Sequence, residues 1–130
     1  MNKKYSIEAV ILAGGLSSRM GKEKAQLRLG RRTLLGHARA LVAELNLPCR
    51  VLRVDRLSGL GPLGGVETAL RRAKADRVLF LSCDMPFLKP DLVEQLLAVG
   101  APAVFATAHG KVGFPFCLSW KILPKVEAQL

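Results

Sequence analysis

The chain has 130 residues, of which 50% are hydrophobic and only 5% aromatic, and it carries a formal net charge of +10. This composition excludes a disordered chain and predicts one domain with an aliphatic core, as in buried parallel sheets. The three cysteines have no metal-finger spacing and no apolar run is long enough to span a membrane, so we expect a cytoplasmic protein without a membrane partner.

The first predicted elements alternate between strand and helix. Residues 7–12 form a short apolar run that stops at a pair of glycines, which is typical of a buried strand opening onto a loop. Thr33 can cap a helix over 34–45, where apolar residues recur on one face before Pro48 ends the segment. Residues 49–54 are the next predicted strand.

The second half of the chain repeats this alternation. Residues 58–65 hold four glycines and a proline, which predicts a loop. The elements that we expect after it are a helix over 66–75, a strand over 77–82, a helix over 90–99, a strand over 103–108 and a helix over 122–130. Alternating strands and helices predict right-handed crossovers and a mostly parallel sheet with helices on its faces, so the predicted fold class is α/β.

Three segments with ligand-binding chemistry follow predicted strands. They are the Gly14-Gly15 pair, the glycines of 61–65 and the carboxylate of Asp84. Because ligands of such sheets bind beyond the carboxyl ends of the strands, we expect these segments to converge on one rim.

The segment 12–24 reads LAGGLSSRMGKEK and carries the features of a phosphate loop. Glycines let backbone N–H groups approach phosphate oxygens, while Arg19 and Lys24 can neutralise the charge of a triphosphate. The spacing matches neither the Walker A loop nor the dinucleotide fingerprint. Taken alone, an ordinary glycine turn explains the segment about as well.

Two aspartates are candidate ligand groups. Asp84 directly follows an apolar strand, where a carboxylate is well placed to hold Mg²⁺, although it can also merely cap the next turn. Asp55 can accept hydrogen bonds from a ribose or base, and a plain surface turn explains it equally well. Cys83 has no histidine near it in sequence, which indicates a buried small residue.

Three motifs in order, LAGGLSSRMGKEKAQLRLG, GPLGGV and SCDMPFL, resemble the MobA family of molybdenum cofactor guanylyltransferases. The resemblance runs from about residue 7 to residue 130. It implies a three-layer, Rossmann-like, mostly parallel sheet of the nucleotide-diphospho-sugar transferase type. Single motifs are shared with cytidylyltransferases, but Ala13-Gly14-Gly15 and GPLGGV look more like the guanylyl branch.

The resemblance implies transfer of GMP from GTP to molybdopterin with release of pyrophosphate, with Mg²⁺ and without a protein nucleophile. The implied nucleotide-binding residues are Leu12, Ala13, Gly14, Gly15, Lys24, Asp55 and Asp84, and the implied catalytic residues are Arg19, Lys24 and Asp84. Asp84 would bind the metal, and Arg19 with Lys24 would hold the phosphates.

The chain departs from the family in two places. Residues 45–55 have room for one strand where the family has two, and the sequence stops at Leu130, before the family's Asn-x-Asn-Thr-Pro type loop. We therefore expect a single domain over 1–130 that lacks the family's C-terminal segment. The alternatives are a CTP-using cytidylyltransferase and a nucleotide-binding module without transferase activity.

Two further expectations concern partners. A nucleic-acid-binding domain has only the positive charge in its favour, and we expect no nucleic-acid partner because a recognition helix and aromatic stacking motifs are missing. The apolar stripe of the last helix, formed by Ile122, Leu123, Val126 and Leu130, suggests a possible homodimer.

Overall fold

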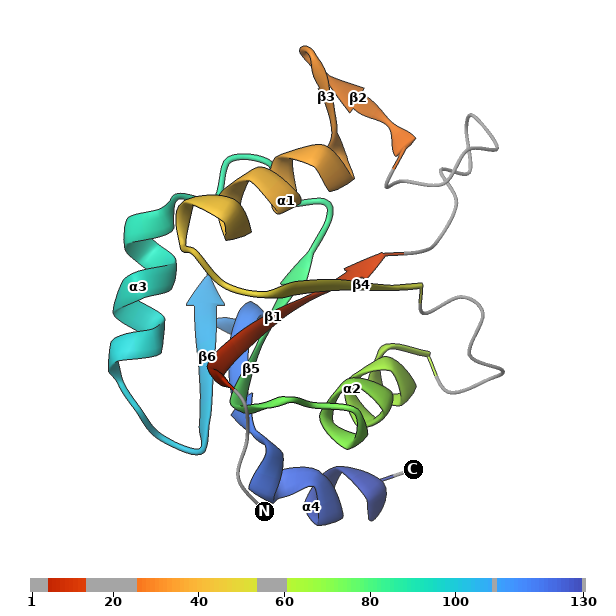
Figure 1. The fold of residues 1–130 in the computed structure, drawn as a ribbon, viewed down its shortest axis with the longest axis vertical. Coiled ribbons are helices and arrows are strands. Elements are labelled where there is room, and N and C mark those ends of the chain that lie inside the picture. Colours follow the sequence, from red (N-terminus) through yellow and green to blue (C-terminus); the bar gives the residue numbers. More distant parts are fainter. Residues whose placement is uncertain (1–4, 14–25, 54–60, 109, 130) are drawn as a thin grey trace.

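The computed structural model describes residues 5–13, 26–53, 61–108 and 110–129, and a five-stranded sheet of order β4-β1-β5-β7-β6 crosses its centre (Figure 1). The sheet strands are β1 (Tyr5–Ala13), β4 (Cys49–Arg53), β5 (Ala75–Ser82), β6 (Ala103–Ala108) and β7 (Lys111–Ser119). The helices are α1 (Leu34–Glu44), α2 (Gly61–Arg71), α3 (Pro90–Ala98) and α4 (Leu123–Glu127), with a 3₁₀ turn, η3 (Trp120–Ile122), before α4. A separate hairpin consists of β2 (Arg28–Leu29) and β3 (Arg32–Thr33).

The sheet is mostly parallel, as predicted. β1 lies parallel between β4 and β5, while β7 runs antiparallel to both β5 and β6. The four predicted strands therefore point the same way, and β7 is the exception that the sequence did not predict.

β7 was missed because Gly113 and Pro115 are unusual within a strand. The ladder with β6 is irregular between Phe105 and Ala106, whose partners on β7 are Phe116 and Gly113. Pro115 falls inside this irregularity, where a residue without an N–H interrupts no regular pairing. The structure thus accommodates the proline at a bulge in an interior strand.

Helices cover both faces of the sheet and form two apolar layers, which confirms the three-layer architecture. Successive residues of β1 and β5 alternate between the layers, as side chains of a strand must. The layer beneath α1 and α3 contains Ala9, Ile11, Leu41, Val42, Leu79, Leu81, Val93 and Leu96. The layer beneath α2 and α4 contains Val10, Leu12, Val66, Leu70, Val78, Phe80, Phe116 and Val126.

Two helix starts agree with their predicted signals. The Thr33 side chain accepts a hydrogen bond from the backbone N of Gly36 at 3.0 Å, so it caps α1 as expected. Pro90 is the first residue of α3, where its missing N–H is not needed.

The start of α2 was predicted wrongly. The helix begins at Gly61, whereas the glycine content of 58–65 predicted a loop as far as Val66. Proline is well tolerated in the first turn of a helix, where Pro62 lies. Val66 and Leu70 are buried where α2 packs against the sheet. Tertiary packing therefore outweighs the poor helix propensity of the glycines.

The last predicted helix forms as η3 and α4. Its Val126 is buried in the layer shared with α2, and Ile122 and Leu123 pack against the same layer. The homodimer that this stripe suggested stays a prediction: Val126 is buried by the chain itself, Ile122 and Leu123 are half-buried, and Leu130 lies outside the described residues. No described helix is both long and apolar enough to cross a membrane.

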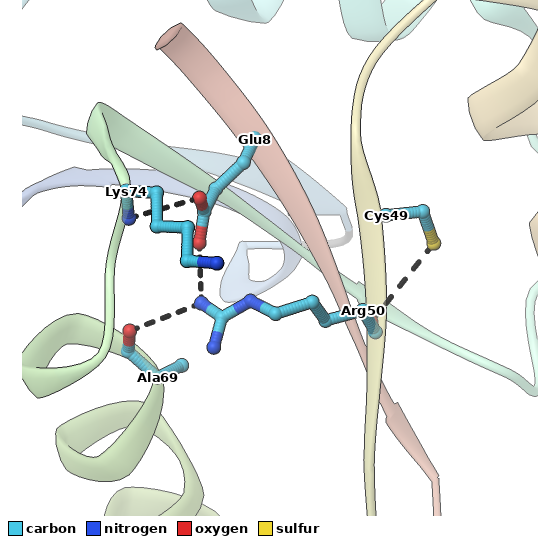
Figure 2. A network of polar contacts seen from close by, with 5 residues as sticks. All are labelled: Glu8, Cys49, Arg50, Ala69 and Lys74. Carbon is cyan, nitrogen blue, oxygen red and sulfur yellow. Dashed lines mark hydrogen bonds and ion pairs between the residues drawn. The ribbon is translucent and has the colours of Figure 1, made fainter. Parts of the chain in front are cut away.

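A buried ion pair ties α2 to the sheet. Among the described residues Glu8 is the only buried charged side chain, and its two carboxylate oxygens accept hydrogen bonds from Arg50 Nη2 and, at 3.0 Å, from the backbone N of Lys74. Arg50 Nη2 also donates to the carbonyl oxygen of Ala69 at 3.2 Å, in the last turn of α2 (Figure 2). The pair therefore joins β1, β4 and the carboxyl end of α2.

Candidate functional site

Three parallel strands end side by side at one edge of the sheet. Ala13, the last residue of β1, is in register with Arg53, the last residue of β4, and Leu12 is in register with Ser82, the last residue of β5. Neighbouring strands of a sheet lie about 4.8 Å apart, so the segments that follow these strands leave from adjacent points. This confirms that β1, β4 and β5 end at one rim. Convergence of the three segments beyond it stays a prediction, because residues 14–25 and 54–60 lie outside the described residues and the glycines of 61–65 belong to the start of α2.

Asp84 lies at this rim, two residues beyond the end of β5, and its side chain is exposed. The Ser82 hydroxyl donates a hydrogen bond to Asp84 Oδ1 at 2.5 Å, and the backbone N of Asp84 donates back to Ser82 Oγ at 3.5 Å. Ser82 thereby fixes the orientation of a carboxylate that remains open to solvent. Sequence reasoning identified Asp84 and missed Ser82, although a hydroxyl two residues before a loop aspartate was a readable signal.

Leu12 and Ala13 offer a ligand only their backbone. Leu12 is 6% exposed and Ala13 is 1% exposed, and they belong to opposite apolar layers. Contact with a base or ribose through these residues would therefore involve main-chain N–H and C=O groups.

The other predicted site residues, namely Gly14, Gly15, Arg19, Lys24 and Asp55, lie outside the described residues, as does His109. The positions of Gly14 and Asp55 in the sequence nevertheless show at which strand end the segment of each one starts. Gly14 directly follows Ala13, and Asp55 follows Arg53 by two residues, so both belong to segments that start at the rim.

The basic residues beyond Lys24 do not gather inside a pocket. Arg28, Arg31 and Arg32 are exposed on the β2–β3 hairpin, and Arg39 is exposed on α1. In the sequence, the run of seven basic residues from Arg19 to Arg39 favours a local phosphate site; the four of them that the structure describes are exposed, and their relation to Arg19 and Lys24 stays a prediction.

A groove adjoins the Asp84 loop and was not predicted, because it is built largely from β7. Its volume is about 310 Å³, and it is lined by Met85, Leu88, Leu92, Ala106, Thr107, Lys111, Val112, Gly113, Phe114 and Pro115. The lining is mainly apolar, with Thr107 and Lys111 as its polar members. Phe114, expected from sequence to serve in packing, is one of its walls.

Asp84 is the candidate metal ligand that the structure describes at the rim. No group of three or more His, Cys, Asp or Glu side chains occurs among the described residues. Mg²⁺ is commonly held by one or two carboxylates together with phosphate oxygens and water, so Asp84 has the right chemistry for such a site.

The cysteines supply no activated nucleophile. None of the three forms a disulfide, and Cys83 and Cys117 are buried as small core residues, which confirms the expectation for Cys83. Burial raises the pKa of the Cys117 thiol, against the lowering effect of Arg77, and burial likewise raises the pKa of the Cys49 thiol, against Arg39. Thiols with raised pKa values stay protonated at neutral pH and are poor nucleophiles.

Comparison with known proteins places the chain among nucleotidyltransferases. The family model of the MobA-like NTP transferase domain matches residues 9–54 and 39–130. A probable molybdenum cofactor guanylyltransferase of Carboxydothermus hydrogenoformans is 41% identical over 103 residues, covering 67% of this chain and 51% of the relative. A molybdenum cofactor guanylyltransferase of Rhodobacter capsulatus is 34% identical over 143 aligned positions, covering 94% and 73% of the two chains.

Solved structures agree on the fold. Rv0371c of Mycobacterium tuberculosis superimposes with a TM-score of 0.75 at 19% identity, covering 95% of this chain and 76% of that chain. A second structure of Rv0371c, in complex with manganese, gives a TM-score of 0.66. The chain spans about half the length of several curated relatives that it matches.

Proposed function

The chain belongs to the family of MobA-like NTP transferase domains, and from that membership we propose that it transfers GMP from GTP to molybdopterin and releases pyrophosphate. The observation that supports the proposal is the register of β4, β1 and β5, whose carboxyl ends lie side by side at one rim, with Asp84 of the third motif beside them. Relatives named as molybdenum cofactor guanylyltransferases support the choice of GTP and molybdopterin.

The proposed chemistry rests on position and charge. The glycine segment after Ala13 would supply backbone N–H groups to the triphosphate, with Arg19 and Lys24 neutralising its charge. Asp84 would hold Mg²⁺, which would supply positive charge to stabilise the negative charge that develops on the phosphates. A manganese complex of the related fold supports a divalent cation in such proteins.

The acceptor would occupy the groove beside Asp84. An apolar wall suits a flat heterocycle, while Lys111 offers a cation to an acidic group. The acceptor's terminal phosphate would then attack the α-phosphorus of GTP in line with the departing pyrophosphate, and no covalent bond to the protein would form.

Two other functions use the same rim. A CTP-using molybdenum cofactor cytidylyltransferase would differ in the contacts to the base, and Asp55, which is expected to touch the nucleotide, lies outside the described residues. A nucleotide-binding module without transferase activity would bind GTP and leave the acceptor unchanged. The chain's length of about half of several relatives is the observation that keeps this second function under consideration.

Asp84→Asn tests the site directly. We expect isothermal titration of the wild type with GTP, CTP and ATP in the presence of MgCl₂ to show the tightest binding for GTP, and binding to weaken at least about tenfold in Asp84→Asn. Asp76→Asn is the matched control, because Asp76 is an exposed aspartate near the amino end of the same strand, away from the rim.

The results separate the candidate functions. Equal GTP affinity of the wild type and Asp84→Asn would contradict the proposed metal site, and preference for CTP would favour the cytidylyl alternative. Pyrophosphate release with GTP and molybdopterin distinguishes the transferase from the module, since only the transferase forms it.

A further inference from the structure

Three arginines stand together on the β2–β3 hairpin. Gly30 adopts a φ of +68° in the turn, a conformation that favours glycine. Arg28, Arg31 and Arg32 are all exposed, and Arg28 Nη2 donates a hydrogen bond to the carbonyl oxygen of Arg31 at 2.6 Å. The hairpin thus presents three guanidinium groups within five residues.

The hairpin is fastened to α1. The Nε2–H of His37 donates a hydrogen bond to the carbonyl oxygen of Leu29 at 2.8 Å, and the backbone N of Leu34 donates to Leu27 O, also at 2.8 Å. One bond links β2 to the first turn of α1, and the other joins the chain before β2 to the helix start. The arginines are therefore held in place on the body of the protein.

The positive charge of this region is uncompensated. Residues 26–43 contain Arg39 in addition to the hairpin arginines and contain no acidic residue. In the part of the chain that the structure describes, none of these four side chains forms a salt bridge, whereas Arg50 and Arg71 each pair with a glutamate. Like charges crowded at the surface are unfavourable for folding, which points to a function of the charge itself.

The hairpin lies toward the rim end of the molecule. The carbonyl oxygen of Pro48, which follows α1, accepts a hydrogen bond from the backbone N of Ala9, four residues before β1 ends. The chain after α1 therefore reaches the middle of β1 and continues into β4, which runs parallel to β1 toward the rim. A helix that connects two parallel strands runs opposite to them, so the amino end of α1, with the hairpin, points toward the rim. Figure 1 shows the hairpin and α4 at opposite extremes of the molecule.

We propose that this basic hairpin steers polyanionic nucleoside triphosphates toward the rim and raises their association rate without contacting the bound nucleotide. The inference rests on the proposed function, since it requires nucleotide binding at the rim. Surface charge of one sign next to a binding site raises association rates by attraction at a distance, and salt suppresses the effect.

A triple variant, Arg28→Gln/Arg31→Gln/Arg32→Gln, tests the proposal by stopped-flow fluorescence with mant-GTP and MgCl₂ at ionic strengths from about 0.01 to 0.15 M. We expect the association rate constant to fall about tenfold at the lowest ionic strength, and the difference to shrink as salt is added. The dissociation rate constant stays unchanged.

The matched control is Arg72→Gln/Lys121→Gln/Lys125→Gln, which removes the same charge from exposed positions around α4 and the end of α2. This control should associate almost as fast as the wild type. Equal slowing of the two triple variants would overturn the hairpin's role in favour of net charge, and a faster dissociation in the hairpin variant would overturn steering in favour of direct contact.

Failure of the proposed function gives a different result. If the wild type itself shows no association with mant-GTP, both the proposed function and the steering are wrong. If the wild type binds and the hairpin variant associates at the same rate at low salt, only the steering is wrong.

Discussion

At the scale of single residues, the Ser82 hydroxyl is the described group that orients the proposed metal ligand. It donates to Asp84 Oδ1 at 2.5 Å, and a hydrogen bond to a charged group contributes about 1.5 to 3 kcal/mol. We expect Ser82→Ala to weaken Mg²⁺-dependent GTP binding about tenfold, as measured by titration calorimetry, because the carboxylate loses its fixed orientation. Ser82→Thr keeps a hydroxyl and should bind like the wild type, and unaltered affinity in Ser82→Ala would contradict the orienting role.

The sequence allowed us to predict the charged group of the candidate site, Asp84, but not the groove beside it. Asp84 was recognisable because a carboxylate directly after an apolar strand has few structural reasons to be there. The groove beside it was not, since its walls come from β6, β7 and α3, and no local pattern indicates which residues of distant segments will share a cavity. Leu12 and Ala13 were expected at the ligand, and their burial restricts that role to their backbone atoms.

At the scale of elements, the Glu8–Arg50 pair is expected to hold α2 in place. Ala69 lies in the last turn of α2, where backbone carbonyl groups generally have no hydrogen-bond donor within the helix. Arg50 donates a hydrogen bond to the carbonyl oxygen of Ala69 from outside the helix. Glu8→Ala leaves Arg50, whose side chain is 35% exposed, without its ion-pair partner, so it should lower the free energy of unfolding by about 1 to 3 kcal/mol. Urea denaturation followed by circular dichroism measures this loss.

Two further variants separate the charge from the packing. Glu8→Gln keeps the size and one carbonyl acceptor, so it should cost less than Glu8→Ala. Glu67→Ala is the matched control, because its partner Arg71 is exposed and a surface ion pair contributes at most about 1 kcal/mol. A loss in Glu8→Ala no larger than in Glu67→Ala would contradict the structural importance of the buried pair.

Elements with one simple signal were predictable, and elements with mixed signals were not. The strands β1, β4, β5 and β6 contain neither glycine nor proline and have apolar or β-branched residues at their centres. The predicted bounds of each differ from the observed ones by at most two residues. β7 carries Gly113 and Pro115, and α2 begins with a glycine-rich turn, so both contradict local propensity. In each case packing against the sheet decided the conformation, which a local reading of the sequence does not see.

At the scale of the whole molecule, the shared edge at which β1, β4 and β5 end followed from topology. Parallel strands joined by helices must all end at the same edge, so their order in the chain was enough to predict a shared rim. The hairpin that carries Arg28, Arg31 and Arg32 was not predictable in this way, because a two-residue strand has no hydrophobic pattern. These side chains are exposed, which suits the proposed attraction of nucleotides from a distance.

The two apolar layers share one sheet, so they should unfold together. Trp120, the only tryptophan, packs against the layer of α2 and α4, while Leu41 of α1 is buried in the other layer. Leu41→Ala should lower the free energy of unfolding by about 2 to 5 kcal/mol, and urea transitions followed by Trp120 fluorescence and by far-ultraviolet circular dichroism should shift equally. Alternate side chains of β1 and β5 pack into one layer or the other, so loss of either layer removes the packing on one face of both strands. If Leu41→Ala moved the circular dichroism transition and left the Trp120 transition in place, the layers would be separate folding units, and binding at the rim would not require both.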